Sequence, residues 1–146
     1  MKTKLISHRG NLTGPDKQNE NNPNYVLSAL SLGYEVEVDV WTDKEKIYLG
    51  HDKPEYPINL DFLKNKKLWC HAKNLNALEY LIDNDVCCFW HQKDDYTITS
   101  RGYIWVYPGK PLIKDSICVL PEQHNLDYSK CYGVCTDNIN KFLKIK

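Results

Sequence analysis

Short apolar runs separated by polar turns recur along the chain and predict a protein built mainly from β-strands. Helical spacing of apolar residues occurs in two of the intervals, from Pro23 to Gly33 and from Asn74 to about Ile82. In the first interval, Pro23 suits an opening helical turn and Gly33 suits a helix end. Eight apolar runs have the length and composition of strands: 3–8, 35–41, 47–50, 68–72, 86–90, 103–107, 117–120 and 133–135.

Strands that alternate with helices favour a parallel sheet, and eight of them can close into a TIM-type barrel. Such barrels usually need more than ~200 residues, whereas this chain has 146. We therefore expect an α/β fold, namely a small, trimmed parallel (β/α)8 barrel with several short or missing outer helices. Because no linker or repeat interrupts the chain, residues 1–146 are expected to form a single domain.

Composition narrows the classes of partner. The 19 Lys and Arg residues balance 19 Asp and Glu residues. The chain therefore has no net positive charge to attract nucleic acid, and nucleic acid is not expected as a partner. No 18 apolar residues follow one another, so stable membrane insertion is not expected. The sequence does not indicate an oligomeric state.

The six cysteines lack the paired C-x2-C spacing of a zinc site, and most lie within apolar runs. A free cysteine in such a run behaves as a small buried hydrophobic residue. We interpret these residues as reduced core cysteines, which predicts a cytoplasmic location. They are Cys70, Cys87, Cys88, Cys118, Cys131 and Cys135.

The run 35–41 alternates valine with carboxylate. Side chains on a strand point to opposite faces in turn, so Glu35, Glu37 and Asp39 share the face opposite the valines. A charged face turned to solvent is one interpretation. The other is a metal site, because like charges held close together usually share a cation or a proton.

Four of the five histidines lie at the ends of successive predicted strands. His8, His51, His71 and His91 follow this rule, and only His124 does not. The carboxyl ends of the strands form the catalytic face of a barrel, so these residues are expected to converge there. Lys73 shares the face of His71 on the fourth predicted strand.

These residues carry a family resemblance. Between residues 8 and 52 the chain contains, in order, His8-Arg9-Gly10, Glu20-Asn21, Glu37-x-Asp39 and His51-Asp52. This order of HRG, EN, ExD and HD motifs resembles the glycerophosphodiester phosphodiesterase family. Thr136-Asp137-Asn138 resembles the close of that family's last strand.

The resemblance implies a metal-dependent phosphodiesterase on a barrel. It places His8 and His51 as general acid and base, and Glu37 and Asp39 as ligands of a divalent metal ion. It also implies that Arg9 and Lys73 bind the phosphate. The chemistry is reasonable, because a metal and cations neutralise the charge that builds up on the phosphoryl oxygens.

The chain departs from the family pattern at two points. His71 stands where the family commonly has a third metal-binding carboxylate. The metal is expected to be Mg, Mn or Ca, and the imidazole favours Mn over Ca. The family's usual insertion after the third strand is absent, so glycerol specificity does not carry over.

We therefore expect a metal-dependent phosphodiester hydrolase that acts on a small phosphodiester. Two alternatives stay open. One is a catalytically weak barrel that binds a phosphorylated metabolite, and the other is a lipid-directed enzyme resembling phospholipase D or phosphatidylinositol phospholipase C. Among residues without an assigned role, His91, Tyr107 and Glu122 fall at predicted strand ends.

Overall fold

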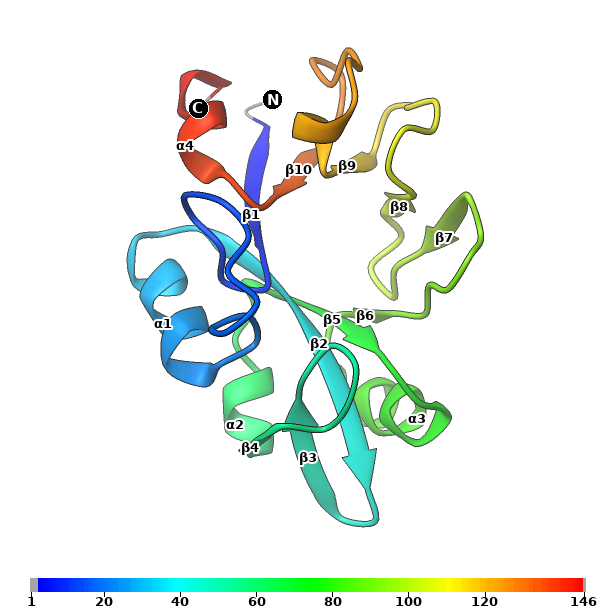
Figure 1. The fold of residues 1–146 in the computed structure, drawn as a ribbon. Helices are drawn as coiled ribbons and strands as arrows, with labels where there is room; N and C mark the ends of the chain where they lie inside the picture. Colours follow the sequence, from blue (N-terminus) through cyan, green and yellow to red (C-terminus); the bar gives the residue numbers. More distant parts are fainter. Residues whose placement is uncertain (1–2, 146) are drawn as a thin grey trace.

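A curved, mixed β-sheet forms the frame of the protein in the computed structural model, which describes residues 3–145 (Figure 1). Parallel pairing runs in the order β6-β5-β2-β1-β10-β9-β8. These strands are β1 (Lys4–His8), β2 (Glu35–Asp43), β5 (Leu68–Ala72), β6 (Cys88–Phe89), β8 (Ile104–Val106), β9 (Ser116–Val119) and β10 (Gly133–Thr136). The antiparallel strands are β3 (Lys46–Leu49), β4 (Tyr56–Ile58) and β7 (Tyr96–Ile98).

The expected closed parallel (β/α)8 barrel is wrong: the sheet is mixed and forms a half-barrel. The predicted third parallel strand, 47–50, is instead β3, which pairs antiparallel to β2. Only residues 44 and 45 lie between these two strands. A connection of two residues makes a hairpin, whereas a parallel crossover needs a dozen or more. The strand β5 takes the parallel place beside β2.

Closure also fails between β6 and β8. Within residues 3–145, no strand pairing joins these two strands. The segment between them, residues 90–103, forms β7, which pairs antiparallel to β8, and contains no helix. The gap is bridged locally, because the Ser100 N–H donates to the Cys88 carbonyl at 2.7 Å and the Phe89 and Trp105 rings stack at 4.3 Å.

The two faces of the sheet have different roles. Val36, Val38 and Val40 of β2 pack with helical residues in one buried cluster. The opposite, concave face holds a second cluster that includes Ile6, Phe89 and Trp105. The carboxylates of β2 therefore point to the inside of the half-barrel, and the solvent-face interpretation is wrong for Glu37 and Asp39, which are 2% and 0% exposed.

Helices are few and short. Both predicted helices are present as α1 (Pro23–Ser31) and α3 (Leu75–Asp83), with Asn22 and Asn74 as their N-caps. The others are α2 (Leu60–Leu63), α4 (Ile139–Phe142) and the 3-10 turns η1 (Pro121–Gln123) and η2 (Leu143–Ile145). In the described part of the chain, no helix has the length and apolar sequence needed to cross a membrane.

Candidate active site

The predicted site residues come together at the carboxyl ends of the parallel strands. The parallel strands β1, β2 and β5 bring His8, Asp39 and His71 to this end of the sheet. The β2–β3 hairpin brings His51 there too, because β3 runs back along β2 and the Gly50 N–H donates to the Asp39 carbonyl at 3.1 Å. The antiparallel direction of β3 thus leaves His51 in reach of the site.

Asp39 is the centre of the site. Arg9 Nε lies 2.9 Å from its Oδ2 atom, and Lys73 Nζ lies 3.8 Å from its Oδ1 atom. His51 Nδ1 and His71 Nδ1 lie 3.4 and 3.1 Å from the same carboxylate. Burial acts to raise the pKa of Asp39, but the histidine hydrogen bonds and the Arg9 charge outweigh it and hold the pKa well below its ordinary value.

Asn21 fixes the position of Asp39. Its side chain donates to Asp39 Oδ2 at 2.9 Å and accepts the Asp39 N–H at 2.9 Å. Asn21 is fully buried, and its backbone has a positive φ of 64°. The loop before α1 therefore holds the carboxylate in one orientation, which explains what the Asn of the EN pair does here.

Glu37 lies beside Asp39, and its pKa shifts in the opposite direction. Its Oε2 atom is 3.8 Å from His8 Nε2, and its Oε1 atom is 4.0 Å from His71 Nδ1. Burial and the neighbouring Asp39 charge raise the pKa of Glu37. The two buried carboxylates are thus held at unequal acidity.

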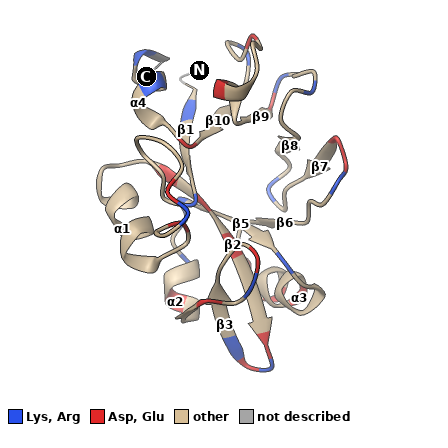
Figure 2. Cartoon of the chain, in the orientation of Figure 1, with Lys and Arg blue, Asp and Glu red and all other residues tan. Residues whose placement is uncertain are grey.

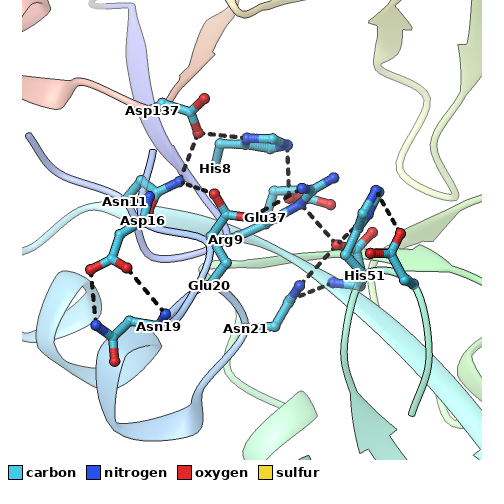
Figure 3. A network of polar contacts seen from close by, with 12 residues as sticks. His8, Arg9, Asn11, Asp16, Asn19, Glu20, Asn21, Glu37, His51 and Asp137 are labelled. Carbon is cyan, nitrogen blue, oxygen red and sulfur yellow. Dashed lines mark hydrogen bonds and ion pairs between the residues drawn. The ribbon is translucent and has the colours of Figure 1, made fainter. Parts of the chain in front are cut away.

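His8 is part of a chain of contacts that runs through Asp137 to Asn11 (Figure 3). His8 Nδ1 lies 2.7 Å from Asp137 Oδ1. Asn11 donates to the same Asp137 oxygen, and Glu122 accepts the Asp137 N–H at 2.8 Å. Burial acts to lower the pKa of His8, but the Asp137 hydrogen bond and the Glu37 charge outweigh it and raise the pKa above 6.5.

Arg9 is oriented by carboxylates on two sides. Its Nη1 atom donates to Glu20 Oε2 at 3.2 Å, while its Nε atom faces Asp39. Asn11 also donates to Glu20, at 3.0 Å. Charges of both signs therefore lie close together where the loop after β1 meets β2 (Figure 2).

His51 occupies the more open side of the site. Its side chain is 43% exposed, and the neighbouring Asp52 lies 3.6 Å away. A tight turn positions it: a Cβ atom on Gly50 would lie 2.0 Å from the Lys53 carbonyl oxygen. Trp41 supports the turn, because its indole N–H donates to the Gly50 carbonyl at 2.7 Å.

Glu37, Asp39 and His71 fit a divalent metal ion. One ligand atom from each lies within 4.8 Å of the others. Among the described residues, buried Glu37 Oε2 has no hydrogen-bond partner, and Asp39 Oδ1 faces His71 Nδ1 at 3.1 Å. His71 Nε2 lies 2.7 Å from the His91 carbonyl oxygen, so Nε2 carries a proton and Nδ1 faces the carboxylates. Metal-ligating histidines commonly donate their second nitrogen to a carbonyl in this way.

Several supporting residues were not assigned roles from the sequence: Asn11, Glu20, Asn21, Glu122 and Asp137. Asp137 stood in the quoted Thr136-Asp137-Asn138 motif, and it directly follows β10, the strand that pairs with β1. That adjacency was a usable signal, because the last and first strands of a barrel are neighbours. Asn11 and Glu122 lie in turns and act only through contacts that the fold creates.

His91 and Tyr107 lie at the rim of the site, where their rings pack edge to face at 5.8 Å. His124 lies outside the site and packs beside Gly109.

Comparison of the chain with protein-family models, curated proteins and solved structures finds no match.

Proposed function

We propose that the protein is a metal-dependent phosphodiester hydrolase that resembles the glycerophosphodiester phosphodiesterases in mechanism. The observation that carries the proposal is the surroundings of the two neighbouring buried carboxylates. His51, Arg9 and Lys73 contact Asp39, and His8 Nε2 lies 3.8 Å from Glu37 Oε2. Acid–base groups and phosphate-binding cations are the two components that phosphodiester hydrolysis requires.

Arg9 and Lys73 supply the positive charge. A phosphodiester is anionic, and more charge collects on its phosphoryl oxygens as a nucleophile approaches. The guanidinium is held between Glu20 and Asp39, so its orientation is set before a substrate binds. Preorganised cations of this kind stabilise the transition state without rearranging during the reaction.

His8 and His51 supply the proton transfers. One imidazole takes a proton from the attacking water while the water oxygen bonds to phosphorus. The other gives a proton to the departing alkoxide as its bond to phosphorus breaks. Asp137 orients His8, so that Nδ1 is occupied and Nε2 faces the interior beside Glu37.

A divalent ion held by Glu37, Asp39 and His71 would supply Lewis-acid polarisation of a phosphoryl oxygen. The mixed oxygen and nitrogen ligands favour Mn over Ca.

The six cysteines are free and buried, and burial raises the pKa of the Cys87 thiol to about 11. We propose a cytoplasmic location, which free, unreactive thiols support.

The test is hydrolysis of bis(p-nitrophenyl) phosphate with added Mg, Mn or Ca. His8→Ala and His51→Ala should each lower kcat by about 10²–10⁴-fold, the usual contribution of a positioned acid or base. The double variant should lose much less than the sum of the two single losses, because the two groups act as one unit. His124→Ala is the matched control and should keep full activity, since His124 is outside the site.

Full activity in both single variants would contradict the catalytic assignment. A wild-type protein that binds metal and phosphate but hydrolyses no diester would instead support the binding alternative.

A further inference from the structure

Two cavities of opposite character meet at the site, and both are lined by Arg9 and His51. The first, of about 370 Å³, is polar. All its other lining residues carry charge, and they include Lys17, Lys53 and Glu55. A cavity with mixed charges and open access suits a hydroxylated group and water.

The second cavity, of about 280 Å³, extends from the site toward β8 and β9. It holds the catalytic His8, which does not line the first cavity. Beyond the site residues, its wall contains no Asp, Glu, Lys or Arg and is mainly apolar, with Val106, Tyr107, Pro108 and Leu120 among its members. A charged group placed there would lose its hydration without gaining a partner.

The wall of this second cavity is built in an unusual way at Leu120. Its backbone is left-handed, with φ 49° and ψ 51°, a conformation that bulky residues rarely adopt. The Leu120 N–H donates to the Cys135 carbonyl at 2.8 Å, and the Leu120 carbonyl accepts from the Gln123 N–H. Strained residues that neighbouring contacts hold in place are concentrated at ligand sites.

We propose that the mainly apolar wall of the second cavity binds an apolar or aromatic alcohol group of the diester, and that this group is the one released. The inference rests on the proposed function. The shared residues Arg9 and His51 place the phosphate between the cavities. Water enters from the polar side and bonds to phosphorus, and its proton passes to His51. The bond from phosphorus to the apolar alcohol breaks, and that oxygen takes a proton from His8.

The probe is benzyl glyceryl phosphate with Mn, because its two primary alkoxides are leaving groups of similar basicity. Phosphorus NMR distinguishes the possible products. We expect glycerol phosphate and benzyl alcohol, whereas benzyl phosphate and glycerol as the main products would overturn the proposed orientation. Diglyceryl phosphate serves as the matched substrate without an apolar group.

Leu120→Asn tests the wall with little risk to folding, because asparagine tolerates a left-handed backbone. It and Tyr107→Ser should lower kcat/KM for benzyl glyceryl phosphate by about tenfold, the loss expected when apolar contact with a substrate group is removed. Their kcat/KM for diglyceryl phosphate should change little. The control is Ile98→Ala, an exposed β7 residue outside both cavities, which should leave both rates unchanged.

Equal losses on both substrates would overturn the inference and leave the proposed function standing. If the wild type hydrolyses neither diester, the proposed function fails, and calorimetry of benzyl glyceryl phosphate then decides the inference. Binding that Leu120→Asn weakens would support the apolar subsite, whereas equal binding or none would overturn it.

Discussion

His8 Nδ1 lies 2.7 Å from Asp137 Oδ1, joining the end of the first strand to the residue after the last strand of the sheet. The bond orients an imidazole that the proposed function assigns to proton transfer. Glu122 accepts the Asp137 N–H, so the carboxylate is itself held in place. Asp137 is therefore a positioning residue that acts through His8.

Asp137→Asn should lower kcat for diester hydrolysis by about 10- to 100-fold, the usual effect of losing a supporting partner. The protonated His8 loses an anionic partner, so its pKa falls. The high-pH limb of the pH–rate profile, where the acid His8 loses its proton, therefore moves to lower pH. A kinetic titration of both proteins measures this. Asp127→Asn, which changes an exposed carboxylate bonded to Ser129, is the control. An unmoved limb would contradict the role of Asp137.

The same pair predicts how stability depends on pH without added metal. The pKa of Asp137 is lowered from 3.8, so its contribution is present above pH 3.8 and is lost as the pH falls through the folded value. The pKa of His8 is raised from 6.5, so its contribution is present below pH 6.5 and is lost as the pH rises through the folded value.

The destabilisation caused by Asp137→Asn should therefore be largest between about pH 4 and 6.5 and smaller at pH 9. Urea unfolding of both proteins at pH 5 and pH 9 measures the difference. A destabilisation that is the same at both pH values would show that the ion pair does not contribute to stability.

Asp39→Asn should abolish measurable binding of Mn in calorimetry, because two anionic ligands set most of the charge of the site. Asp43→Asn, an exposed carboxylate further along the same strand, should bind as the wild type does. His71→Glu should shift the preference from Mn toward Ca, since it replaces the nitrogen ligand with oxygen. If Asp39→Asn binds Mn normally, the carboxylates have only a structural role.

Gly50→Ala should move His51, because the added Cβ would lie 2.0 Å from the Lys53 carbonyl. We expect kcat/KM to fall by about tenfold or more, since small displacements of a catalytic group are costly. Gly33→Ala is the control: this glycine also has a positive φ, of 92°, but an added Cβ atom would meet nothing within 4 Å. Equal activity in the two variants would rule out the steric explanation.

The ring pair Phe89 and Trp105 should hold the open side of the half-barrel together. The rings stack at 4.3 Å between two strands that do not pair. A double-mutant cycle with Phe89→Leu and Trp105→Leu, followed by urea unfolding, should give a coupling of about 0.5–1.5 kcal/mol. Additive losses would show that the stacking is incidental.

Local sequence patterns were sufficient for much of this protein. Alternation along residues 35–41 identified the strand and its two faces, and the motifs around His8 and His51 named the residues that meet at the site. Pro23 and Asn74 marked helix starts that the structure contains. These features depend on neighbouring residues, so they can be read from the chain alone.

Tertiary structure alone decided the direction of β3, the opening between β6 and β8, and the contact of Asp137 with His8. A strand-like run has the same alternation whether it pairs parallel or antiparallel. The expected barrel followed from counting strands, although residues 42–46 between the expected strands 35–41 and 47–50 are already too few for a parallel crossover. Pairing partners and contacts across 129 residues depend on how the whole sheet packs, which no local pattern encodes.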